Sequence, residues 1–168
     1  LLPAIVGPVE VQRIAVGGHS YAGAIALDVG LTDARIAAVI DIDGGARSPA
    51  GSAAPRQATL VIVTMNAGVV ADPALAALVV RSPRIVSVGV DDALHMDVTD
   101  GGSIPSVLGT SVFSTLLGKA GRTGTTDVNA IVRRFLGAAI GRPPRQPTGA
   151  ELVSGLPSTN DDPFAGVR

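Results

Sequence analysis

The chain has 168 residues, a formal net charge of -1 and a hydrophobic fraction of 46%, which predicts one globular domain with a sizeable core and excludes a disordered protein. Its arginines are scattered and Lys119 is its one lysine, so no basic patch indicates binding to nucleic acid or to an anionic membrane. The absence of cysteine excludes disulfides and thiolate metal sites. The sequence contains no run of about twenty apolar residues, so it predicts no transmembrane segment.

The first expected element is a strand that ends in a glycine turn and continues into a helix. The strand is expected over residues 11–16, and the helix runs from the turn to about Leu31. Between them, residues 18–22 read Gly-His-Ser-Tyr-Ala, which follows the pattern G-x-S-x-G with alanine in the last place. A serine at the sharp corner between a buried strand and a helix is typical of a nucleophile elbow. Alanine is acceptable if that residue is helical, because no positive φ is then needed.

Two interpretations of Ser20 follow from this stretch. As a nucleophile it would project from the end of the sheet, where the backbone N–H of Tyr21 and the helix N-terminus favour an oxyanion. The residues that flank the turn are small, as a sharp corner requires: Gly18, Ala22 and Gly23. Alternatively, Ser20 simply caps the helix after a glycine turn.

The chain then alternates strands and helices up to about residue 90. Three further strands are expected, at residues 36–43, 58–65 and 84–90. The strand at 58–65 is apolar almost throughout, as a strand buried on both faces should be. Asp72-Pro73 is expected to start a short helix, because aspartate caps helices and proline suits the first turn. This order predicts an α/β fold with a mostly parallel sheet of about four strands and covering helices.

The last part of the chain is expected to be less regular. Residues 101–126 are rich in glycine, serine and threonine, with one short helix near residues 112–117. Residues 127–140 repeat apolar side chains at helical spacing, and Thr126 can cap that helix. From Pro143 onward the sequence is polar and proline-rich, which indicates a surface arm.

Three residues with complementary chemistry each follow the end of a different expected strand: Ser20, Asp43 and His95. In a parallel sheet the carboxyl ends of the strands lie at one edge, where active sites gather. A serine nucleophile needs a base and a carboxylate that orients the base. Of the two histidines, His19 neighbours Ser20 and should point away from it, toward packing or hydrogen bonding under the elbow. His95 is therefore the expected base.

The residues alone do not decide which aspartate orients His95. Asp41 and Asp43 lie two apart on one strand and so face the same side, and Asp43 is nearer the carboxyl end. Asp72 follows the next strand, but a helix cap explains it equally well. The four aspartates around His95 are most simply solvated loop charges: Asp91, Asp92, Asp97 and Asp100.

Three blocks of the sequence carry a resemblance to a known family. They are residues 13–23 (RIAVGGHSYAG), 38–44 (AVIDIDG) and 94–100 (LHMDVTD). These blocks resemble α/β-hydrolases related to platelet-activating factor acetylhydrolase, especially their bacterial lipase-like relatives. The resemblance covers about residues 11–142, and the closing helix also looks like the family's final helix.

The resemblance implies a serine ester hydrolase whose acid follows the strand after the elbow. The family has a short gap from serine to aspartate and a long gap from aspartate to histidine. Here Asp43 follows Ser20 by 23 residues and His95 follows Asp43 by 52, which places Asp43 ahead of Asp72. Tyr21 would supply one oxyanion N–H. The resemblance implies no metal or organic cofactor, and it implies a small-molecule or lipid ester as substrate.

The family also has several strands before the elbow strand, and a loop after one of them supplies the second oxyanion N–H. No such strands are evident before residue 11, and the chain begins at Leu1 without a methionine or a signal-peptide pattern. We therefore expect residues 1–142 to be the C-terminal part of an α/β-hydrolase domain and residues 143–168 to be a polar tail. The elbow strand would be an exposed edge through which chains associate. A non-catalytic, partner-binding fragment is the alternative function.

Overall fold

The structure is a computed structural model that describes residues 13–47, 54–64, 72–91, 93–99, 121–157 and 159–165. The helix expected near residues 112–117 lies outside these ranges, as do residues 11 and 12 of the expected elbow strand. In the part of the chain that is described, no helix combines the length and the apolar character that a membrane span needs.

A five-stranded sheet forms the centre of the fold, with the strands in the order β1-β2-β3-β4-β5. The strands are β1 (Ile14–His19), β2 (Ile36–Ile42), β3 (Ala58–Thr64), β4 (Ile85–Val90) and β5 (Thr159–Asn160). The first four pair in parallel, and β5 pairs antiparallel with β4. The predicted α/β class is confirmed, and the sheet has one strand more than the sequence led us to expect.

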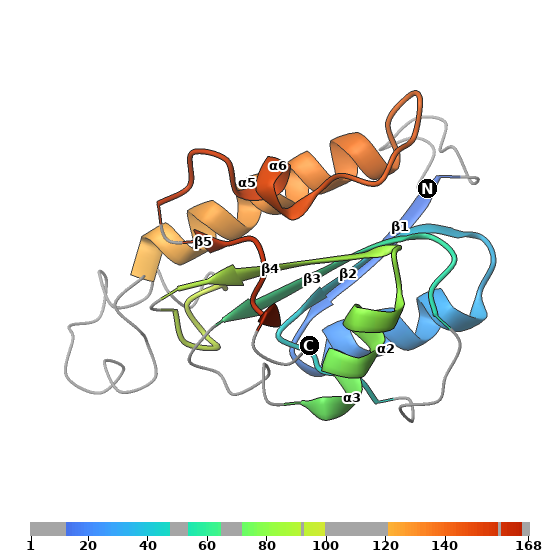
Figure 1. Cartoon of the computed structure of the whole chain (residues 1–168), viewed down its shortest axis with the longest axis horizontal. Helices are drawn as coiled ribbons and strands as arrows, with labels where there is room; N and C mark the ends of the chain where they lie inside the picture. Colours follow the sequence, from blue (N-terminus) through green and yellow to red (C-terminus); the bar gives the residue numbers. More distant parts are fainter. Residues whose placement is uncertain are drawn as a thin grey trace, which may run out of the picture.

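Helices cover both faces of this sheet (Figure 1). They are α2 (Tyr21–Thr32), α3 (Pro73–Arg81), α5 (Gly121–Ala139) and α6 (Gly149–Val153). The pair α2 and α3 packs on one face, and the pair α5 and α6 on the other. Successive residues of β3 alternate between the two layers, Leu60 facing α5 and Val61 facing α2 and α3. Every residue of β3 is buried, as its apolar run predicts for a strand covered on both faces.

The elbow strand is longer at its carboxyl end than the apolar run that predicted it. Instead of ending at Val16, β1 continues through two glycines to His19, because it stays in register with β2 as far as Ile42. Within the described residues β1 has no partner on its other side. Ile14 at its start is 36% exposed. The described part of the sheet therefore has the edge that the sequence predicted.

Helix α3 begins where its capping residues predicted. The Asp72 carboxylate accepts hydrogen bonds from the backbone N–H groups of Ala74 and Leu75, at 2.8 and 3.2 Å. Pro73 occupies the first turn, where its missing N–H costs nothing. Local sequence is sufficient here because every group involved lies within one turn.

Helix α5, in contrast, begins at Gly121 and not at residue 127. Its extra first turns are rich in glycine and threonine, which local propensity disfavours in a helix. The Thr125 hydroxyl donates to the backbone carbonyls of Asp97 and Thr99, at 2.9 and 3.1 Å. Contacts with a distant turn thus hold this part of the helix, and the sequence carries no local sign of them.

The segment after residue 143 packs against the core and does not form the expected surface arm. Leu152 and Phe164 are 1% and 0% exposed, and they join the core on opposite faces of the sheet. Single apolar residues in a proline-rich segment have no periodicity, so the sequence did not indicate this packing. The division of the chain at residue 142 into a hydrolase part and a tail stays a prediction.

Candidate active site

Ser20 lies at a strained corner between β1 and α2. Its backbone has φ 58° and ψ -131°, a conformation that L-residues rarely adopt and that nucleophile elbows use. The Ser20 N–H donates to the Ile42 carbonyl at 2.8 Å, which continues the pairing of β1 with β2. The side chain makes no capping hydrogen bond to α2. This geometry favours the elbow interpretation over the alternative in which Ser20 serves as a helix cap.

The small residues around the elbow are required by close backbone contacts. A Cβ atom on Gly18 would lie 2.4 Å from the carbonyl carbon of Ala22. A Cβ atom on Gly23 would lie 2.3 Å from a carboxylate oxygen of Asp41 and 2.8 Å from the Gly18 carbonyl oxygen. Ala22 is already helical, so alanine is acceptable there for the reason given above.

The backbone N–H of Tyr21 lies at the N-terminus of α2. Tyr21 is the first residue of α2, so no carbonyl of that helix can accept its N–H. The positive end of the helix dipole lies at the same point and favours negative charge. The Tyr21 side chain is 64% exposed, and the Arg47 guanidinium lies 4.5 Å above its ring centroid.

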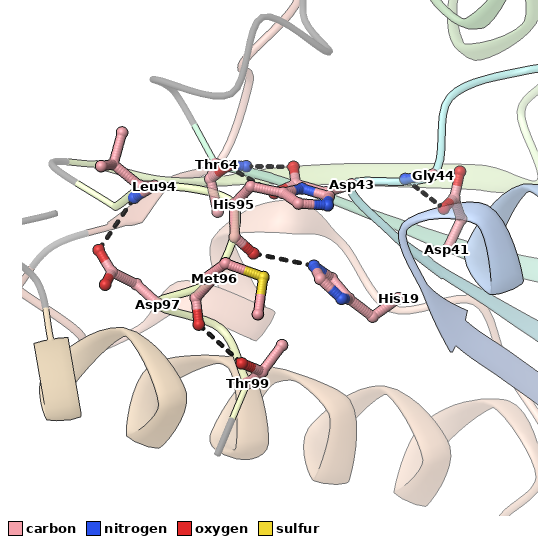
Figure 2. Close-up of polar contacts among 10 residues, drawn as sticks. All are labelled: His19, Asp41, Asp43, Gly44, Thr64, Leu94, His95, Met96, Asp97 and Thr99. Carbon is pink, nitrogen blue, oxygen red and sulfur yellow. Dashed lines mark hydrogen bonds and ion pairs between the residues drawn. The ribbon is translucent and has the colours of Figure 1, made fainter. Parts of the chain in front are cut away.

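Asp43 and His95 meet across the carboxyl ends of β2 and β4 (Figure 2). His95 Nδ1 lies 3.3 Å from Asp43 Oδ2. The Asp43 side chain is fully buried, whereas the His95 side chain is 38% exposed. Because a carboxylate can only accept, His95 carries its proton on Nδ1. The lone pair of its Nε2 is then available to take a proton, as a general base requires.

Thr64, the last residue of β3, fixes the Asp43 carboxylate. Its backbone N–H donates to Asp43 Oδ1 at 2.7 Å, and its hydroxyl donates to Asp43 Oδ2 at 2.5 Å. Both groups are buried. This role of Thr64 was not predicted from the sequence, although a threonine at the carboxyl end of an apolar strand is a usable sign of it.

The two other candidate acids have different partners. Both carboxylate oxygens of Asp72 accept backbone N–H groups, those of the α3 cap and that of Ala46 at 2.9 Å. Asp41 is fully buried and accepts the Gly44 N–H at 2.8 Å. Burial raises the pKa of Asp41 to about 7. Asp43 is thus the candidate that the structure places against His95.

The turn that carries His95 is held by buried groups. Asp97 is fully buried, and its Oδ2 accepts the Leu94 N–H at 2.9 Å. The expectation that Asp97 is a solvated loop charge was therefore wrong, because this carboxylate closes the turn around His95. Asp91 is half-buried at the end of β4, and Asp92 and Asp100 lie outside the described residues.

His19 contacts the same turn from the end of β1. Its Nε2 lies 2.9 Å from the backbone carbonyl oxygen of His95, and the two ring centroids are 4.4 Å apart (Figure 2). Since a carbonyl only accepts, Nε2 of His19 carries a proton and donates. Burial, then the neighbouring His95, lowers the pKa of His19. Hydrogen bonding was the role expected for His19, but its partner is the backbone of the candidate base itself.

His19, Asp43 and His95 also form the one group of described residues whose nitrogen and oxygen atoms are close enough to be considered as metal ligands, all within 4.8 Å. A metal takes the lone pair of an imidazole nitrogen. His95 Nδ1 and His19 Nε2 both lie in hydrogen bonds to oxygen acceptors, where they carry protons. Each ring keeps a lone pair on its other nitrogen, His95 Nε2 and His19 Nδ1, so these contacts are compatible with proton transfer and with a metal ligand alike.

The fold resembles that of an esterase. A ferulic acid esterase from Streptomyces cinnamoneus matches with a TM-score of 0.69 at 22% sequence identity, over 95% of this chain and 51% of the esterase. The chain therefore spans about half the length of this solved structure. Comparison with protein-family models and with curated protein sequences gave no match.

Proposed function

We propose that this chain carries the catalytic residues of a serine ester hydrolase, with Ser20 as nucleophile, His95 as base and Asp43 as the acid that orients the base. The contact between His95 Nδ1 and Asp43 Oδ2 carries the proposal. Two hydrogen bonds bring this pair toward the elbow. Ser20 bonds to Ile42, the residue before Asp43, and His19, the residue before Ser20, bonds to His95.

The chemistry of such a site is acyl transfer through an acyl-enzyme. Ser20 Oγ forms a bond to the ester carbonyl carbon while its proton passes to His95 Nε2, and the Tyr21 N–H donates to the developing oxyanion. The C–O bond to the alcohol then breaks, and the alcohol leaves with the proton held by His95. Water repeats both steps and releases the acid. Asp43 stabilises the imidazolium that forms in each step.

The substrate class we propose is a small-molecule or lipid ester, as the resemblance to hydrolases related to platelet-activating factor acetylhydrolase implies. The similarity of the fold to a solved esterase supports ester hydrolysis in general, without indicating which ester. This chemistry needs no metal or organic cofactor, because serine, histidine and aspartate supply the nucleophile and the proton transfers.

Hydrolysis of p-nitrophenyl acetate by the purified chain tests this proposal. Tyr21 is the one oxyanion donor that we assign, and because one donor is worth about 10²–10³-fold in rate, we expect hydrolysis that much slower than that of an esterase with two donors. Ser20→Ala should reduce even this weak activity to the level of buffer. Ser154→Ala removes an exposed hydroxyl from the residue that follows α6 and should leave the rate unchanged. Hydrolysis that survives Ser20→Ala would contradict the assignment of the nucleophile.

A second candidate is a non-catalytic module that binds a partner through the edge of its sheet. The observation in its favour is that β1 is an edge within the described residues, in a chain that spans half of the matched esterase. Sedimentation velocity with fluorophosphonate labelling separates the two functions. Self-association without any labelling at Ser20 supports the binding module, and labelling that depends on His95 supports the enzyme.

A further inference from the structure

The side chain of His19 joins two segments that are far apart in the sequence. His19 is the last residue of β1, and its Nε2 donates to the carbonyl oxygen of His95, 76 residues away in the chain. The ring of His19 also lies against the ring of His95, with 4.4 Å between centroids and 35° between planes. One side chain therefore contacts both the backbone and the imidazole of the candidate base.

The other restraints on this turn act mainly on its backbone. Asp97 accepts the Leu94 N–H, Thr99 donates to the Met96 carbonyl at 2.7 Å, and Thr125 donates to the Asp97 carbonyl. The His95 ring itself is held by Asp43 at one nitrogen, over 3.3 Å. A single hydrogen bond leaves an imidazole free to tilt about that bond. A second contact, on the face of the ring, restricts this tilt.

We propose that His19 is a positioning residue, which holds His95 in register with Asp43 by donating from Nε2 to the His95 carbonyl and by packing against its ring. The effect on turnover rests on the proposed function. The effect of His19 on the position of the His95 ring does not depend on it. A misplacement of about 1 Å in a catalytic group can lower a rate by about 10²-fold, so a residue of this kind affects turnover without touching substrate.

His19 has to be neutral to do this well. Among the described residues, the titratable groups that act on it are His95 and Asp43. During acyl transfer His95 becomes an imidazolium, and a charged His19 against its ring would oppose that step. Burial and the presence of His95 hold the pKa of His19 below its ordinary value, which favours its neutral form.

The test uses the fact that the chain has only two histidines. A ¹H–¹⁵N spectrum of the imidazoles therefore reports on His19 and His95 alone, and in His19 variants on His95 alone. His19→Gln keeps an N–H donor at nearly the same reach, whereas His19→Asn keeps the amide but is too short to reach the carbonyl. In the wild-type chain and in His19→Gln, we expect the His95 proton to stay on Nδ1, in slow exchange. In His19→Asn, we expect the two tautomers of His95 to average.

Turnover of p-nitrophenyl acetate provides the second measurement. His19→Asn should lower kcat by about 10–100-fold with little change in KM, and His19→Gln should recover most of that loss. Tautomer averaging in His19→Asn without any Ser20-dependent hydrolysis in the wild-type chain would support the positioning role and reject the esterase. An unchanged His95 signal in a folded His19→Asn, or equal loss of the signal in both variants, would overturn the positioning role.

Discussion

The two halves of the candidate site are supported very differently. Asp43 extends from β2, a strand paired on both sides, and Thr64 from the neighbouring strand fixes its carboxylate. Ser20 extends from β1, which is the edge of the sheet within the described residues and whose first residue, Ile14, is exposed. The proposed acid and base thus follow strands that are paired on both sides, whereas the proposed nucleophile follows a strand that is paired on one side.

This difference separates two requirements of a serine hydrolase. In the function that we propose, activation of Ser20 depends on His95 and Asp43, and these two side chains are already in contact. Stabilisation of the oxyanion depends on N–H donors around Ser20, and here Tyr21 is the one donor that we assign. Changes to the acid–base half should therefore alter turnover sharply, and changes to the edge should mainly alter association.

The largest effect is expected from Asp43→Asn, which removes the acceptor that keeps the His95 proton on Nδ1. By analogy with the serine protease triad, kcat should fall about 10⁴-fold, measured against p-nitrophenyl esters. Asp72→Asn is the matched control: asparagine can also cap a helix, it gives up only the bond that Asp72 Oδ2 accepts from Ala46, and it should leave kcat within a few-fold. The assignment of the acid is wrong if the Asp72 variant loses more activity than the Asp43 variant.

Asp41, which lies between the two halves, should make stability depend on pH. Its pKa of about 7 in the folded protein lies above the value of about 3.9 expected in the unfolded chain. The folded state then binds more protons between these values, so the favourable contribution is complete below about pH 4 and is lost as the pH rises to about 7. Asp41→Asn should remove this dependence, which is worth roughly 4 kcal/mol at most.

Thermal unfolding of the wild-type chain and of Asp41→Asn between pH 4 and 8 measures this effect. The melting temperature of the wild-type chain relative to that of the variant should decrease with pH over that interval, because the other titrating groups are common to both proteins. Parallel curves for the two proteins would mean that Asp41 is ionised in the folded state at every pH tested.

A smaller effect is expected from Thr64→Val, which removes the hydroxyl that donates to Asp43 Oδ2. The carboxylate keeps the Thr64 N–H, so kcat should fall by about 10-fold, the scale of one net hydrogen bond. Thr59→Val is a matched control on the same strand, because Thr59 is also buried but its hydroxyl donates to the Gln57 carbonyl. Equal loss of kcat in both variants would indicate a general packing defect.

The smallest effect on stability is expected at the edge. Ile14→Lys places a charge on an exposed edge position, which is a common way to prevent strand pairing between chains. The free energy of unfolding should change by about 0.5 kcal/mol or less, whereas sedimentation velocity should show less self-association. A chain that is already a monodisperse monomer before the substitution would contradict the expected association through β1.

Local chemistry explains which parts of the fold the sequence predicted. The apolar run of β3, the Asp72-Pro73 cap and the order of strands and helices all depend on neighbouring residues, and the structure has each of them. Asp43 was favoured by its place beyond a strand end and by a family resemblance, and the structure places it against His95.

The missed features depend on contacts between distant segments. Asp97 looked like one of several loop charges, yet it is buried and closes the turn around His95. The first turns of α5 have poor helix formers, and Thr125 is held there by a turn near residue 97. Phe164 lies in a proline-rich segment without periodicity, but it fills the core. Contacts of this kind join residues that are distant in the sequence, so local patterns do not predict them.

The most direct test of the central claim is the mass of the chain after treatment with a fluorophosphonate, with the modified residue located by tandem mass spectrometry. The account predicts one phosphonyl group on Ser20 in the wild-type chain, and labelling slowed at least 10²-fold in His95→Ala because the nucleophile loses its base. Labelling at another serine, or labelling of Ser20 at the same rate with and without His95, would contradict the claim that His95 and Asp43 activate Ser20.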